Sequence, residues 1–151
     1  MICLASVGLI LPGRESNTLL DLVACGSAQR AGEILATWPS AHRVAVAYAV
    51  GLDFLMNPAY MTTIGIATIW AGRQFTAPPA GRIAAGLAWL AWSVVVTNIV
   101  ENVGLFVALT AGPADPWPLM VATAHYWAGI VVVLCIVFLV AGGLARAKSA
   151  A

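Results

Sequence analysis

Apolar residues run almost without interruption through three long segments of the chain, residues 44–72, 83–110 and 119–145. Each segment is longer than the roughly 20 residues that a helix needs to cross the hydrocarbon core of a bilayer. The connections between them, residues 73–82 and 111–118, contain the Pro, Gly and polar residues that favour turns. The pattern predicts three transmembrane helices joined by short loops.

A fourth apolar segment, residues 1–25, is interrupted by the polar run GRESN at 13–17. With Pro12 as a kink it is long enough to span, provided that Arg14, Glu15 and Asp21 pack against other helices. We predict a fourth span here, and an interfacial or re-entrant segment is the alternative. Because the apolar run has no preceding basic residues and no convincing cleavage site, we expect it to be retained rather than removed as a signal peptide.

A short helix is expected between the first two spans, at about residues 28–38. Ser27 can cap this helix, and Pro39 ends it. Leu35 lies on an apolar face and Arg30 on a polar one, which suits a helix in the membrane interface; a solvated connector is the alternative. The predicted fold is an all-α integral membrane protein, an antiparallel bundle of four transmembrane helices with one interfacial helix, in a single domain of residues 1–151.

The composition supports a membrane location and excludes one class of partner. The chain is 62% hydrophobic and only 9% charged, whereas roughly a quarter of the residues in soluble domains are charged. The formal net charge is +1 and the basic residues are scattered singly, so we expect no nucleic-acid binding. The three cysteines, Cys3, Cys25 and Cys135, lack CxxC spacing and are interpreted as small buried hydrophobic residues.

The distribution of basic residues predicts how the chain is oriented. One side of the membrane carries the 73–82 loop and the C-terminal tail, and the other carries fewer basic residues offset by acids. An excess of Lys and Arg marks the cytoplasmic side, so we predict a cytoplasmic C-terminus. The residues that decide this are Arg73, Arg82, Arg146 and Lys148 on one side, and Arg30, Arg43, Glu33 and Asp115 on the other.

Ionisable residues in four separate segments fall at nearly the same predicted depth. At about 1.5 Å per residue, Asp53 and Glu101 each lie about 15 Å below the outer end of their helix, His125 about 12 Å and Arg14 roughly 16 Å. Charges at this depth are costly and normally face the interior of a helix bundle, where they pair. The sequence therefore predicts a polar layer inside the membrane.

Polar and aromatic neighbours accompany this layer. Carboxamides in membranes often only hydrogen-bond to adjacent helices. For Asp53 and Glu101 we favour a functional role, because Asn or Gln would make a purely structural contact at lower cost. The candidate ligand-binding residues are Arg14, Asp53, Asn57, Tyr60, Asn98, Glu101, Asn102, His125 and Trp127.

No motif for nucleophilic catalysis, phosphate binding or a metal occurs in the sequence. Asp53, Glu101 and His125 offer the donors of a two-carboxylate, one-histidine metal site, but without local spacing this signal is weak, and we predict no metal and no cofactor. The same three residues are the candidates for acid–base catalysis if the protein is an enzyme. Trp89 and Trp92, three residues apart, are interpreted as helix-packing residues.

Three runs of residues occur in a recognisable order: ACGSAQRAGEILATW at 24–38, LDFLMNPAY at 52–60 and NIVEN at 98–102. In this order they resemble the pattern of a group of small, uncharacterised bacterial membrane proteins with four predicted spans. The resemblance implies a bacterial plasma membrane and a four-span topology, and no chemistry. The sequence departs from the pattern at Asn98, where Asp is usual, and at His125, where Lys is common, so a mechanism that needs a third carboxylate with a lysine counter-ion is in doubt.

Three functions are compatible with these features. The first is an accessory subunit or a protein that binds a lipid-like ligand, built around the polar layer. The second is a membrane-embedded enzyme acting on a lipid or isoprenoid, with Asp53 or Glu101 as general acid or base. The third is a proton- or cation-coupled transporter, which four short helices can form only as an oligomer. The expected partners are the bilayer, a lipid-like ligand, and other membrane subunits or further copies of the chain.

Overall fold

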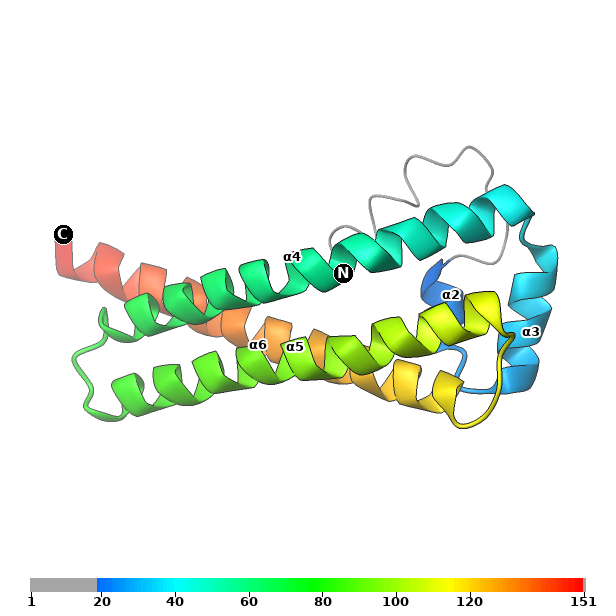
Figure 1. Ribbon diagram of the computed structural model, residues 1–151. Helices are drawn as coiled ribbons and strands as arrows, with labels where there is room; N and C mark the ends of the chain where they lie inside the picture. Colours follow the sequence, from blue (N-terminus) through cyan, green and yellow to red (C-terminus); the bar gives the residue numbers. More distant parts are fainter. Residues whose placement is uncertain (1–18, 151) are drawn as a thin grey trace. The chain divides into compact units, whose positions relative to one another are not determined.

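The computed structural model describes residues 19–150, which form α-helices and contain no strand. Three long helices, α4, α5 and α6, are long and apolar enough to cross a membrane, which confirms the three predicted apolar helices. The predicted N-terminal span lies mostly outside the described residues, as do Arg14 and Cys3. The helices are α2 (Leu19–Ala24), α3 (Ala28–Thr37), α4 (Ser40–Gly72), α5 (Pro79–Thr110) and α6 (Trp117–Ala150) (Figure 1).

The chain divides into two compact units, and each long helix contributes to both. Unit 1 is Met1–Met56 with Thr97–Tyr126, and unit 2 is Asn57–Val96 with Trp127–Ala151. Unit 1 therefore contains α2, α3, the first half of α4, the second half of α5 and the start of α6. Unit 2 contains the remaining parts of the three long helices. That the whole chain is one domain stays a prediction.

Unit 1 has an apolar core to which the two short helices contribute strongly. α2 and α3 supply large side chains to it, and Trp38, which follows α3, is only 5% exposed. The apolar face predicted for α3 is thus buried against protein. The buried residues of this core are Leu22, Val23, Ala31, Ile34, Leu35, Trp38, Val46, Val50, Leu105, Ala108 and Val121.

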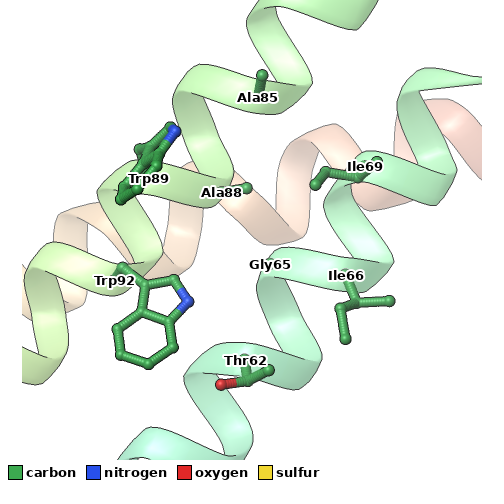
Figure 2. Close-up of a pocket in the computed structure, with 8 residues that line it drawn as sticks. All are labelled: Thr62, Gly65, Ile66, Ile69, Ala85, Ala88, Trp89 and Trp92. Carbon is green, nitrogen blue, oxygen red and sulfur yellow. The ribbon is translucent and has the colours of Figure 1, made fainter.

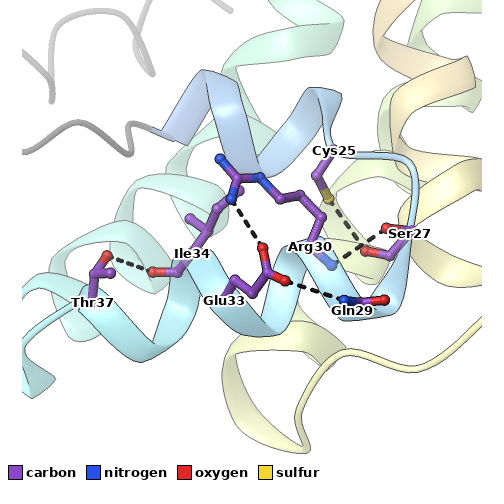
Figure 3. Close-up of polar contacts among 7 residues, drawn as sticks. All are labelled: Cys25, Ser27, Gln29, Arg30, Glu33, Ile34 and Thr37. Atoms are coloured by element: carbon purple, nitrogen blue, oxygen red, sulfur yellow. Dashed lines mark hydrogen bonds and ion pairs between the residues drawn. The ribbon is translucent and has the colours of Figure 1, made fainter.

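The other face of α3 is polar and ordered by local contacts (Figure 3). The hydroxyl of Ser27 accepts a hydrogen bond from the backbone amide of Arg30, as expected of an N-cap. The Arg30 guanidinium lies 3.0 Å from the carboxylate of Glu33, to which Gln29 also donates. The hydrogen bond from Arg30, followed by that from Gln29, lowers the pKa of Glu33 below its usual value. A carboxylate of the α5–α6 loop, Asp115, accepts from the first amide of α3.

Unit 2 is held together by small residues where its helices meet. A β-carbon added to Gly142 of α6 would lie 2.7 Å from the β-carbon of Ala71, and one added to Gly72 would lie 2.5 Å from that of Ala84. Such distances require the absence of a side chain, so glycine lets the backbones approach closely. The buried apolar core of this unit consists of Met61, Ala91, Val94, Ala128, Val131 and Cys135.

Candidate functional site: a buried polar cluster and an apolar groove

Three of the predicted residues form a closed hydrogen-bonded triangle in unit 1. The amide of Asn98 donates to Oδ2 of Asp53 at 2.7 Å, and the amide of Asn102 donates to the same oxygen at 3.2 Å. Asn102 also donates to Oδ1 of Asn98 at 2.9 Å. Asp53 and Asn102 are fully buried and Asn98 is 6% exposed. The triangle joins α4 to α5 in a place that water does not reach.

Helical spacing explains why one carboxylate meets two carboxamides. Asn98 and Asn102 are four residues apart on α5, so their side chains lie one above the other on the same face. Both amide groups therefore point toward α4, where Asp53 supplies the acceptor. Burying the Asp53 carboxylate costs free energy, and the two hydrogen bonds that it accepts offset part of this cost.

Unit 1 also contains a polar pair, Glu101 and His125, and Glu101 lies between Asn98 and Asn102 on α5. Nδ1 of His125 on α6 lies 3.3 Å from Oε1 of Glu101 on α5. The carboxylate side chain is 3% exposed and the imidazole 17%. Together, the triangle and this pair link α4, α5 and α6 through polar side chains within unit 1. We call these five residues, Asp53, Asn98, Glu101, Asn102 and His125, the polar cluster.

The side chains of the polar cluster make hydrogen bonds to one another. Within the described chain, one buried acceptor in it has no hydrogen-bond partner, Oδ1 of Asn102. No group of three or more His, Cys, Asp or Glu side chains among residues 19–150 is placed to hold a metal ion. The arrangement can fix the rotation of three helix segments within unit 1, and it places the Glu101 carboxylate beside the His125 imidazole.

The remaining candidates belong to unit 2 or lie outside the described residues. Asn57 donates to the hydroxyl of Tyr60 at 3.4 Å, and the indole of Trp127 donates to Ser93 at 3.0 Å. These contacts stay within unit 2. Arg14 lies outside the described residues, so its predicted place in the layer stays a prediction.

Sequence reasoning missed an open apolar groove between α4 and α5 in unit 2. Its volume is about 520 Å³. Figure 2 shows Gly65, Ile66 and Ile69 on α4, and Trp89 and Trp92 on α5. We call this the α4–α5 groove; it is lined by Thr62, Gly65, Ile66, Ile69, Ala85, Ala88, Trp89 and Trp92.

The interpretation of the two tryptophans as helix-packing residues was wrong. Trp89 is 77% exposed and Trp92 is 45% exposed. Small residues lie near them where α4 and α5 approach: a β-carbon added to Gly65 would lie 3.7 Å from the carbonyl oxygen of Ala88. The sequence contains the residues of the groove, with small residues on both helices and two tryptophans three residues apart on α5. Only the relative rotation of α4 and α5 shows that these residues line one groove.

No protein-family model, curated protein or solved structure matches this chain. The resemblance to small bacterial four-span proteins therefore stays a prediction.

Replacing Glu101 by Gln tests whether the pair with His125 needs a charge. Glutamine has nearly the same shape and still offers a hydrogen-bonding group to the imidazole, so we expect the unfolding free energy to fall by less than about 1 kcal/mol. Glu101→Leu removes the partner and should cost more. Reversible unfolding in mixed micelles measures both. Unfolding of Glu101→Gln under conditions where Glu101→Leu folds would contradict a hydrogen-bonding role.

Proposed function

We propose that this protein is a multi-pass membrane protein that binds a lipid-like ligand by its hydrocarbon chain in the α4–α5 groove. The groove itself carries the proposal. Its lining combines aromatic and branched aliphatic side chains with Gly and Ala. Ligand sites are concave and mostly apolar with few polar groups. The polar groups here are the Thr62 hydroxyl, which donates to the carbonyl of Pro58, and the indole N–H groups of Trp89 and Trp92.

The polar cluster has a separate role, which is to hold the helix segments of unit 1 together. Asn98 and Asn102 both donate to Asp53, Asn102 also donates to Asn98, and Glu101 faces His125. Side chains engaged in this way hold helices at fixed rotations. We therefore assign the polar cluster a packing role within unit 1, and ligand binding to the groove of unit 2.

We further propose the topology in which this groove works. α4, α5 and α6 span the plasma membrane of a bacterium, residues 1–25 form a fourth span, and α3 lies in the outer interface with the C-terminus in the cytoplasm. The supporting features of α3 are its exposed charged residues, Arg30 and Glu33, whose side chains are 54% and 51% exposed, opposite its buried apolar face. The excess of Arg and Lys in the 73–82 loop and after residue 145 supports the orientation.

Filling the groove tests the function. Ala85 is an exposed residue that lines the groove, so Ala85→Leu places a branched side chain where the hydrocarbon chain would lie. We expect retention of added phosphatidylcholine, measured by native mass spectrometry after delipidation, to fall about tenfold, a loss of roughly 1.4 kcal/mol.

The matched control is Ala59→Leu. Ala59 is also an exposed alanine of unit 2, on α4 and outside the groove lining, so its variant should retain lipid like the wild type. Equal retention by both variants and the wild type would show that lipid binds elsewhere and would overturn the proposal. Thermal unfolding of each variant establishes that lipid loss is not caused by unfolding.

A further inference from the structure

The charged residues of unit 2 are all basic. All the acidic residues of the sequence, Glu15, Asp21, Glu33, Asp53, Glu101 and Asp115, belong to unit 1. The basic residues of unit 2 lie in the α4–α5 loop, at the start of α5 and near the end of α6: Arg73, Arg82, Arg146 and Lys148. No carboxylate of unit 2 is therefore present to pair with them.

Both walls of the α4–α5 groove lead to one of these arginines. On α4, the lining residues Ile66 and Ile69 are followed by Arg73, which lies seven and four residues further on. Its backbone amide donates to the carbonyl of Trp70, so the helical turn continues to this residue. On α5, Arg82 precedes Ala85 by three residues. Residues spaced by three, four or seven share one face of a helix, so Arg73 and Arg82 continue the two walls beyond the loop end of the groove.

Neither arginine is engaged by the described part of the chain. Both side chains are exposed, and neither guanidinium makes a hydrogen bond or ion pair with residues 19–150. Arg146 differs, because its guanidinium lies 5.4 Å from the centre of the Trp70 ring in a cation–π contact. Two free guanidinium groups thus remain near the end of an apolar groove.

We infer that the α4–α5 groove binds an anionic glycerophospholipid, with an acyl chain between Trp89, Trp92, Ile66 and Ile69 and the phosphate at Arg73 and Arg82. The inference rests on the proposed function and names the class of ligand. Guanidinium groups bind phosphate oxygens through paired hydrogen bonds, and basic pockets at the end of transmembrane helices bind anionic headgroups. A headgroup with net negative charge also neutralises a region that has no carboxylate of its own.

The experiment compares two lipids that share their acyl chains and differ in headgroup charge. Purified full-length protein is mixed with equal amounts of phosphatidylglycerol and phosphatidylcholine, and native mass spectrometry gives the ratio of the two bound lipids. We expect the wild type to favour phosphatidylglycerol by roughly tenfold. The double variant Arg73→Gln/Arg82→Gln should lose this preference and keep binding both lipids, because the groove is unchanged.

Two further variants separate the possible failures. Ala85→Leu should reduce both lipids together, whereas Arg146→Gln should change the ratio little, because Arg146 contacts Trp70. Equal binding of both lipids by the wild type, with loss of both in Ala85→Leu, would overturn the headgroup assignment and leave chain binding intact. Binding of neither lipid would overturn the proposed function as well.

The same samples test two alternatives: that the arginines bind free phosphate rather than a lipid, and that a second copy of the chain occupies the groove. An excess of inorganic phosphate should not displace phosphatidylglycerol, because the acyl chain supplies much of the contact; displacement would show an anion site without a lipid. A change from dimer to monomer in Ala85→Leu, with no change in bound lipid, would show that a second copy of the chain occupies the groove, and would also overturn the inference.

Discussion

Asp53→Leu should lower the free energy of unfolding by about 3 kcal/mol, because it removes the oxygen that accepts from both Asn98 and Asn102 and each unsatisfied buried donor costs about 1–3 kcal/mol. The distances of 2.7 and 3.2 Å and the complete burial of Asp53 support a contribution of this size. Reversible unfolding in mixed micelles by increasing SDS measures the loss. Asp53→Asn keeps a side-chain oxygen in the same place and should lose less.

The triple variant Asp53→Leu/Asn98→Ala/Asn102→Ala separates unsatisfied donors from other effects. It removes all three polar groups, and its larger residue on α4 is compensated by two smaller ones on α5. Replacing every partner of a buried hydrogen bond by apolar groups can be nearly neutral, so this variant should recover more than half of the stability lost by Asp53→Leu. A triple variant less stable than the single one would contradict the triangle as the cause, as would an Asp53→Leu protein of wild-type stability.

The long helices could be predicted closely from the sequence, because an apolar run long enough to cross a bilayer is a strong signal for a helix. The predicted ends at residues 72 and 110 coincide with the ends of α4 and α5. The starts differ by a few residues, since Ser40–Arg43 and Pro79–Arg82 continue the helices through polar residues that a hydropathy pattern leaves outside the membrane. Helix ends extend beyond the hydrocarbon core wherever turn chemistry allows.

The contacts of the polar residues could be predicted only in part. Depth along each helix follows from counting residues, and Asp53, Glu101 and His125 all belong to unit 1. The partner of each residue depends on rotation about the helix axis. α4, α5 and α6 are apolar on most faces, so the sequence pattern gives little information about which face turns inward. It therefore did not show that Asp53 meets Asn98 and Asn102 while Glu101 meets His125.

The groove was harder to predict than the polar cluster for a physical reason. Buried polar groups are unusual in a membrane helix and are noticed at once, whereas a groove is an absence of side-chain volume. Its lining includes Gly65, Ala85 and Ala88, and such small residues are common in any membrane helix. Only the packing of α4 against α5 distinguishes small residues that form a groove from those that permit close contact, such as Gly72 against Ala84.

Gly142→Ala should destabilise unit 2 by about 1–3 kcal/mol, the usual cost of forcing extra atoms into a packed interior. The added β-carbon would lie 2.7 Å from the β-carbon of Ala71, 3.0 Å from its carbonyl oxygen and 3.1 Å from its α-carbon. None of these atoms belongs to a flexible side chain, so α6 and α4 must move apart. The adjacent variant Gly143→Ala is the matched control, because a β-carbon there meets nothing within 4 Å.

The two glycine variants make the same chemical change one residue apart on α6, so intrinsic helix propensity acts equally on both. The difference between their unfolding midpoints in mixed micelles therefore measures the contact with Ala71 alone. Ala71→Gly in the Gly142→Ala background should restore stability in part, because it removes the atom that the new methyl group meets first. If Gly142→Ala and Gly143→Ala were equally stable, α4 and α6 would not pack through these residues, and the close helix approach in unit 2 would be wrong.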